Sequence, residues 1–153
     1  MMLEKVTLVL LATLTPVSEL RGGIPLGLSL GLDPIFTLFI AVLANTLLFL
    51  PVFLGLELFY ERLLSKWKPF HLYLKRVRKK GQPWVERYGF LGLTLFVAVP
   101  LPASGVYTGT TLSWLLGMDR RKAFLAVCLG VTLAGVVVLL TTLGIMSGIK
   151  NLL

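Results

Sequence analysis

Two long runs without a charged side chain, residues 34–56 and 123–149, constrain the fold of this chain more than any other feature. Each run is longer than the about 20 apolar residues with which an α-helix crosses the hydrocarbon core of a bilayer. The composition agrees, because only 14% of the residues are charged, whereas a soluble domain carries about 25%. We therefore predict an all-α integral membrane protein in which both runs form transmembrane helices.

The remaining apolar segments, residues 6–14, 26–32 and 90–99, are too short to cross a bilayer. As α-helices they reach about 10–18 Å, which is roughly half of the hydrocarbon core. A polar insert with Pro and Gly interrupts each half of the chain, TPVSELRGGIP in the first and PLPASGVYTGTT in the second. Irregular backbone at membrane depth is tolerated only where protein or water surrounds it. We therefore expect a re-entrant helical hairpin in each half.

The two halves share the order of their segments. In both, the second short segment ends in a Gly-x-Asp motif, LGLD at 30–33 and LGMD at 116–119, and a long apolar run follows. We predict two repeats, residues 1–60 and 89–153, each a re-entrant helical hairpin followed by a transmembrane helix. The connector, residues 61–88, is basic, and we expect an amphipathic helix on the membrane surface over residues 57–77.

The basic residues indicate the orientation of the chain. Twelve of the fifteen Lys and Arg residues lie in the connector or at 120–122, directly before the last run. If each hairpin enters and leaves on one face, both basic clusters lie on the same side, as the positive-inside rule favours. The repeats are then inverted, both termini lie outside the cell, and connector 61–88 is cytoplasmic. Four complete crossings would instead place 120–122 opposite the connector.

The low Cys and His content excludes several chemistries. With one Cys (Cys128) and one His (His71), the chain cannot form an internal disulfide or gather the ligands of a zinc site. His71 lies in the basic connector, which argues against a catalytic triad. We expect no metal, no cofactor and no catalytic residue. The N-terminal residues resemble a signal peptide without a clear cleavage site, so we expect them to be retained.

The first polar insert places Glu19 and Arg21 between apolar segments. A charge at mid-membrane costs roughly 2.5–3.5 kcal/mol, so both residues need partners or water. Residues two apart point away from each other on a helix but share one face of an extended segment. We therefore predict that residues 18–25 are unwound and that both charges face one cavity. The alternative is an interfacial charge pair on a hairpin that does not enter the membrane deeply.

The backbone of the inserts suggests two helix starts. The sequence GGIP at 22–25 favours a helix start, because Pro is preferred at the first helical position, and Ser104-Gly105 can open the other returning arm. Helix N-termini attract anions. We predict a substrate or ion site formed by Glu19, Arg21, Gly22, Gly23, Ser104, Gly105, Tyr107 and Thr108. The predicted hinges or helix breaks are Pro16, Pro25, Pro100, Pro102 and Gly109.

Other features of the long runs concern packing. Ala126, Gly130 and Ala134 recur every four residues. Such a face of small residues allows close helix contact, either between two copies of the chain or with the hairpin arms. We expect Pro51 to kink the first run and Asn45 to hydrogen-bond to a neighbouring helix; the alternative for Asn45 is that it faces the cavity.

The segments PVSELRGGIPLGLSLG and PLPASGVYTGTTLSWLLGM together resemble the small multidrug export family, which is a distant relative of the DedA/VTT membrane proteins. The resemblance covers essentially the whole chain. It implies a prokaryotic multi-pass membrane protein with two re-entrant hairpins, each followed by a span. DedA-like relatives are associated with the translocation of lipid-carrier phosphates and with proton-dependent drug tolerance. The resemblance also implies roles for Glu19, Arg21, Gly22, Pro25, Pro100, Pro102, Gly105 and Gly109.

These observations favour a small transporter rather than an enzyme. It would move an amphipathic or anionic organic substrate or a lipid-carrier phosphate, with Glu19 as a proton or counter-charge site. The alternatives are a four-span drug exporter, an intramembrane enzyme acting on lipid phosphate, and a scaffold without transport. The expected partners are membrane lipids, the substrate and a second copy of the chain, because two spans are few to enclose a pathway. A run such as KRVRKK is typical of a topology determinant, so we expect no nucleic-acid partner.

Overall fold

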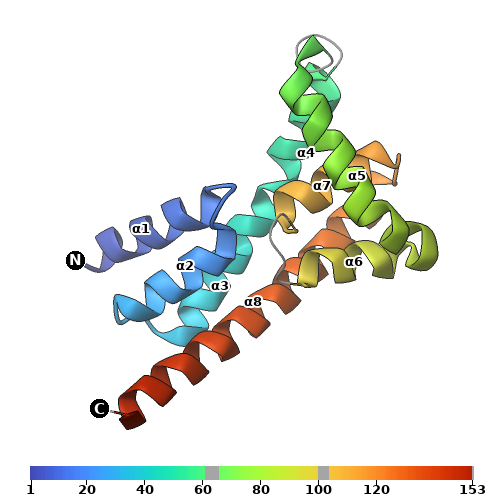
Figure 1. Ribbon diagram of the computed structural model, residues 1–153. Coiled ribbons are helices and arrows are strands. Elements are labelled where there is room, and N and C mark those ends of the chain that lie inside the picture. Colours follow the sequence, from blue (N-terminus) through green and yellow to red (C-terminus); the bar gives the residue numbers. More distant parts are fainter. Residues whose placement is uncertain (61–65, 100–103, 153) are drawn as a thin grey trace. The chain divides into compact units, whose positions relative to one another are not determined.

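The computed structural model describes residues 1–60, 66–99 and 104–152, and these residues form helices joined by short turns (Figure 1). The helices are α1 (Met2–Leu14), α2 (Glu19–Ser29), α3 (Pro34–Leu47), α4 (Phe49–Phe59), α5 (Lys68–Tyr88), α6 (Phe90–Ala98), α7 (Val106–Leu115) and α8 (Arg120–Leu152). The chain divides into two compact units. The first contains residues 1–45 and 132 onward, and the second contains residues 46–131.

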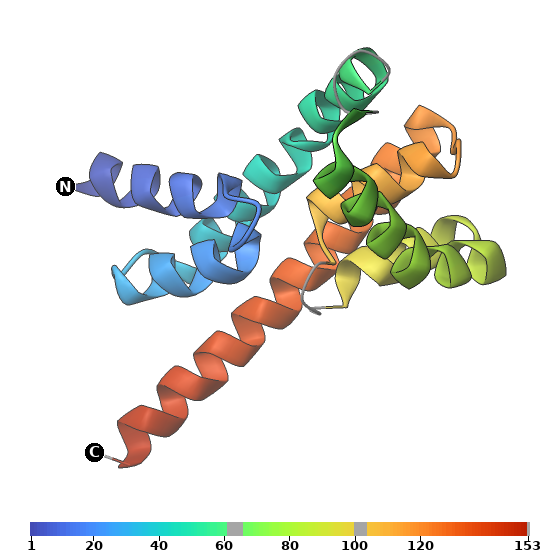
Figure 2. The ribbon, with the colours of Figure 1, turned by 45° about the horizontal axis from the view of Figure 1, so that its top comes forward.

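Among the described residues, two helical runs are long and apolar enough to cross a membrane, Pro34–Phe59 and Arg120–Asn151. They contain the two uncharged runs of the sequence, which confirms that both runs form helices of sufficient length and apolar character for a span. In the most apolar 18-residue stretch of each run, only 28% and 44% of the residues, respectively, are buried within the protein. The core helix of a soluble protein would be mostly buried, so these exposed apolar sides suit contact with lipid. Figure 2 shows α8 as one continuous helix.

The first run is interrupted at Leu48, between α3 and α4. Pro51 explains this position, because it has no N–H to donate to the carbonyl of Leu47, and its ring clashes with that carbonyl. The regular hydrogen bonding resumes with the bond from Val52 N to Leu48 O, 3.1 Å long. The predicted effect of Pro51 is therefore found one turn before the proline itself.

The four short helices cannot cross a bilayer. Helices α1, α2, α6 and α7 contain 13, 11, 9 and 10 residues, so each is about 14–20 Å long, against roughly 30 Å for the hydrocarbon core. The structure thus has short helices before each long run, in the order that the sequence predicted. Their depth in a membrane stays a prediction.

In the first unit, α1 and α2 form an antiparallel hairpin and lie side by side in both ribbon views (Figures 1 and 2). Lys5 Nζ donates a hydrogen bond to Leu30 O, 2.6 Å long, which joins the start of α1 to the end of α2. The helices meet at Gly23, where an added Cβ would lie 2.0 Å from Thr13 Oγ1. Only a glycine therefore allows this close approach.

In the second unit, α6 packs against α5, α7 and the first part of α8. Gly130 of α8 faces α6, since a Cβ there would lie 2.7 Å from Thr94 O and from Val97 Cβ. Ala126, in the same unit, is buried as well, with 0% of its surface exposed, and Ala134, which belongs to the first unit, is 3% exposed. The sequence left open what the small-residue face of α8 contacts. In the structure Gly130 receives a hairpin arm.

The helix in the connector differs from the prediction. Helix α4 ends at Phe59, residues 61–65 lie outside the described residues, and α5 begins only at Lys68 and continues to Tyr88. The predicted helix over 57–77 is therefore wrong in both bounds, because Pro69 in the first turn favours a start there. The expected amphipathic character is present: Leu74, Val77 and Gly81 are buried while the basic side chains are exposed.

The ends of α2 and α7 have the same hydrogen bonds. Gly31 and Gly117 both have positive φ, 76° and 63°. Leu32 N donates to Gly27 O, and Met118 N donates to Ser113 O, so both bonds join residues five apart. This pattern, with a glycine in the left-handed region, is a Schellman C-cap. The correspondence between LGLD and LGMD therefore extends to backbone geometry.

The following Asp residues also act alike. Asp33 Oδ1 accepts a hydrogen bond from Phe36 N at 2.9 Å, and Asp119 Oδ1 accepts one from Lys122 N at 3.1 Å. Each carboxylate thus caps the start of the long helix that follows it. In both halves a glycine with positive φ ends a short helix and an aspartate caps the start of a long one. This shared arrangement supports the predicted repeat at this junction.

Candidate functional site: the polar turns before α2 and α7

The turn between α1 and α2 is closed by hydroxyl groups. Ser18 Oγ donates to Ala12 O and is 2.7 Å from Thr15 Oγ1, which in turn donates to Ala12 O at 2.8 Å. Pro16 lies exposed in this turn, at the predicted helix break. These bonds satisfy the carbonyl of Ala12, near the end of α1, and bring the chain back toward α2.

Glu19, the first residue of α2, combines burial with an unusual backbone. Only 7% of its surface is exposed, and its φ is 47°. Among the described residues it is the one non-glycine residue with positive φ. Such a conformation costs of order 1–3 kcal/mol and persists where the surrounding structure enforces it. A buried carboxylate on such a backbone is therefore a candidate functional group.

Arg21 lies in the first turn of α2, half-buried, and Glu19 acts on it electrostatically. The prediction that residues 18–25 are unwound is wrong from Glu19 onward. Glu19 N bonds to Thr15 O and Gly22 N to Ser18 O, each 3.0 Å long, so the turn continues directly into the helix. The hydroxyl-closed turn starts the helix before the glycine pair, which the pattern of charges alone did not indicate.

The glycine pair has a packing role in this structure. An added Cβ on Gly22 would lie 2.6 Å from Ser18 Cβ, and Gly23 is the contact point with Thr13. Both residues lie inside α2, as does Pro25, so the predicted helix start at 22–25 and the predicted break at Pro25 are wrong. Their proposed role in binding is not tested by this geometry.

The second polar turn leads into α7. Ser104 is 4% exposed, and its Oγ donates to Val99 O at 2.6 Å. Gly105 precedes the first helical residue, which confirms that Ser104-Gly105 opens the returning arm. Tyr107 is half-buried and Thr108 is buried in the first turn of α7.

The remaining predicted hinges or helix breaks are Gly109, Pro100 and Pro102. Gly109 lies inside α7, where an added Cβ would be 2.4 Å from Val97 Cγ2, so it is a contact with α6 and not a helix break. Pro100 and Pro102 lie outside the described residues. The structure thus assembles Glu19, Arg21, Gly22 and Gly23 in the first unit, and Ser104, Gly105, Tyr107 and Thr108 in the second.

Three buried polar side chains lack hydrogen-bond partners within the described parts of the chain. They are Asn45, with both amide atoms unpaired, and the hydroxyls of Thr46 and Thr110. The prediction that Asn45 bonds to a neighbouring helix is therefore wrong. Asn45 and Thr46 lie halfway along Pro34–Phe59. The sequence pointed to Asn45 and to Thr110, one of the hydroxyl residues of the second polar insert, but not to Thr46, because Thr in a helix usually bonds to its own backbone.

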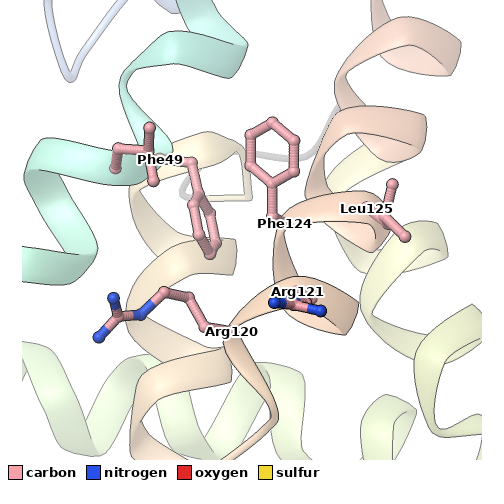
Figure 3. A pocket seen from close by; sticks show the side chains of 6 residues that line it. Phe49, Arg120, Arg121, Phe124 and Leu125 are labelled. Carbon is pink, nitrogen blue, oxygen red and sulfur yellow. The ribbon is translucent and has the colours of Figure 1, made fainter.

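An apolar pocket beside two arginines, which the sequence reasoning missed, lies between α4 and the start of α8 in the second unit (Figure 3). Its volume is about 350 Å³, and it is lined by Phe49, Leu50, Arg120, Arg121, Phe124 and Leu125. From the sequence, residues 120–122 indicated only the side of the membrane on which this part of the chain lies. The available clue was the apolar Phe124-Leu125 pair directly after the basic triplet.

Among residues 1–60, 66–99 and 104–152, no three His, Cys, Asp or Glu side chains gather into a metal-binding group.

A model of the family described as "Putative small multi-drug export protein" matches residues 19–137. The match starts at Glu19 and extends into α8, so it includes the polar turn before α7 and the whole of the first long run. No curated protein and no solved structure matches the chain.

Proposed function

Because the chain belongs to the family of small multidrug export proteins, we propose that it exports amphipathic organic compounds that carry an anionic group, using the buried polar residues at the start of α2. The family is one of transporters rather than enzymes by its description, and two apolar helices long enough to cross a membrane agree with this class. The observation that carries the proposal is Glu19, a buried carboxylate on strained backbone that interacts electrostatically with Arg21.

The proposed arrangement has two crossings, by α3–α4 and by α8. The α1–α2 and α6–α7 helices are re-entrant hairpins from opposite faces, so the two repeats are inverted. Both termini lie outside, and α5 lies on the cytoplasmic face. The short helix lengths, the basic residues of α5 and the basic residues at 120–122 support this arrangement. Discontinuous helices from inverted repeats that meet near mid-membrane are a recurring design of transporters.

The proposed chemistry uses the charge pair. In the resting state Glu19 balances the charge of Arg21, so little net charge is buried. When the substrate's anionic group binds Arg21, it takes the place of Glu19 as counter-charge, and Glu19 takes up a proton. Substrate and proton then move together without leaving an uncompensated charge in the membrane, which would be costly. A part for Ser104, Tyr107 and Thr108 in substrate binding stays a prediction.

A transport assay with a charge-matched control tests this proposal. The purified chain is reconstituted in liposomes, and efflux of an anionic dye, carboxyfluorescein, and a cationic dye, ethidium, is followed with a pH-sensitive dye in the lumen. We expect carboxyfluorescein efflux with proton movement, and a loss of at least tenfold in Glu19→Gln and in Arg21→Gln.

The control variant is Glu4→Gln, which changes an exposed carboxylate of α1 that pairs with the N-terminal amine. Its efflux should equal that of the wild type. Size-exclusion elution and thermal unfolding establish that all variants are folded. Wild-type efflux in both Glu19→Gln and Arg21→Gln would overturn the proposal, whereas efflux of ethidium alone would overturn the anionic substrate. A lipid-carrier phosphate as substrate, the kinship with DedA proteins and a homodimer stay predictions.

A further inference from the structure

We propose that the pocket between α4 and the start of α8 binds one anionic phospholipid of the surrounding leaflet. Its phosphate would contact Arg121, and one acyl chain would lie against the aromatic wall of the pocket. This site is separate from the polar turn at Glu19, and the proposal does not depend on transport. It depends on α8 being a transmembrane helix, as its length and composition indicate.

The apolar part of the pocket is built from rigid aromatic packing. Phe49 is fully buried, and its ring meets that of Phe124 edge to face, with centroids 5.4 Å apart. Leu50 and Leu125 are 46% and 56% exposed, so they leave the apolar wall accessible from outside. A volume of about 350 Å³ is at the lower end of the range of ligand pockets, about 300–1,000 Å³. An acyl chain is a suitable occupant for a wall without polar groups.

The charges at one end of the pocket are not equivalent. Arg120 Nη2 is 2.6 Å from Glu57 Oε2, and its guanidinium lies over the ring of Phe53, 5.4 Å from the centroid. Figure 3 shows the Arg120 and Arg121 side chains pointing in different directions. Arg120 therefore has its carboxylate partner within the protein, whereas Arg121 is exposed and lines the pocket. Arg121 is the cation that is placed to meet a ligand.

The local charge balance favours a monoanion. Asp119 Oδ1 accepts hydrogen bonds from the backbone N–H groups of Arg121 and Lys122, at 3.0 and 3.1 Å. These N–H groups are therefore used, and a ligand would bind to side chains. The two carboxylates, Glu57 and Asp119, face three cations at residues 120–122, which leaves one positive charge in excess. A phosphodiester carries one negative charge and complements it.

The position of the pocket along α8 favours a lipid over other anionic ligands. The basic triplet at 120–122 ends where the uncharged run begins at Ala123. In a bilayer this boundary lies at the level where lipid phosphates meet acyl chains, and basic residues at that depth attract anionic lipids. A phospholipid presents its phosphate and its chain in the same order as Arg121 and Phe124 follow each other along the helix.

Lipid retention by the purified full-length chain tests this inference. The protein in dodecyl maltoside is titrated with phosphatidylglycerol or with phosphatidylcholine of the same acyl chains, and bound lipid is counted by native mass spectrometry. We expect one phosphatidylglycerol per chain to be retained in preference to phosphatidylcholine, and to raise the melting temperature. Arg121→Gln should weaken this retention at least tenfold.

Two pairs of matched variants distinguish lipid binding in this pocket from general electrostatic attraction of lipid to the basic residues 120–122. Lys122→Gln removes the adjacent exposed cation, which does not line the pocket, and should retain lipid within about twofold of the wild type. Leu125→Ser removes part of the wall and should weaken retention severalfold, whereas Leu129→Ser, one turn further along α8 and equally exposed, should not. Leu125→Ser also keeps the test decisive if Arg121→Gln does not fold.

Three outcomes would overturn the inference. Equal retention of phosphatidylglycerol and phosphatidylcholine would exclude recognition of the charge. Equal loss in Arg121→Gln and Lys122→Gln would show diffuse attraction to the basic triplet. Displacement of the lipid by millimolar glycerol 3-phosphate would show a site for soluble anions that needs no acyl chain.

Discussion

Replacing Asn45 by Leu should stabilise the protein. Asn45 is fully buried, and neither its amide nitrogen nor its amide oxygen has a hydrogen-bond partner among the described residues. Leaving a polar group buried and unpaired costs about 1–3 kcal/mol, and replacing it by an apolar group of similar shape removes that cost. Leu has the same branching and the same number of heavy atoms as Asn. The larger volume of its methyl groups offsets part of the gain, so we expect about 1–2 kcal/mol more stability after this correction.

Unfolding in mixed micelles of dodecyl sulfate and dodecyl maltoside measures this difference, with the circular dichroism of the helices as the signal. The control is Thr46→Val, which removes one unpaired hydroxyl at the next position and should give a smaller gain. Native proteins retain such costs mainly where function requires them. Asn45→Leu should therefore lose transport activity while it gains stability. A variant that unfolds more easily than the wild type would refute the reasoning, because the amide would then have a stabilising partner.

Two further sets of substitutions test the helix packing and the repeated helix caps. Gly23→Ala should destabilise the α1–α2 hairpin by about 1–3 kcal/mol, since the new Cβ meets Thr13 Oγ1 at 2.0 Å, and adding Thr13→Ala should recover part of this loss. By contrast, Gly144→Ala, in open space on α8, should stabilise by about 0.5–1 kcal/mol, and a loss there in the same unfolding assay would contradict the account. Asp33→Ala and Asp119→Ala should each cost about 0.5–2 kcal/mol through loss of the helix cap, and a clear difference between them would argue against equivalent junctions.

The long helices and the ends of the short ones were predictable because local rules decide them. An uncharged run of sufficient length forms an apolar helix in any context, and the Gly-x-Asp motif combines a residue that tolerates positive φ with a capping carboxylate. Both rules act over a few residues. The prediction for α8 and for the junctions at Gly31 and Gly117 therefore agrees with the structure.

The start of α2 was not predictable in the same way. The spacing of Glu19 and Arg21 suggested an extended segment, but the hydroxyls of Thr15 and Ser18 close the preceding turn and start the helix earlier. Gly109 and Pro25 disfavour a helix in isolation, yet both lie within helices, and Gly109 packs against Val97 of α6. The pocket at Arg121 depends on residues from α4 and α8, which are far apart in sequence, so the local clue at Phe124-Leu125 was not sufficient to predict it.

The sidedness of the two basic clusters tests most directly whether the chain crosses the membrane only twice. Single cysteines are introduced by Lys79→Cys, Lys122→Cys and Asn151→Cys in a Cys128→Ala background, and intact cells are treated with a membrane-impermeant maleimide. We predict that positions 79 and 122 react only after the cells are permeabilised, whereas position 151 reacts from outside. Labelling of position 122 on the face opposite to position 79 would contradict the account, because the α6–α7 hairpin would then cross the membrane completely.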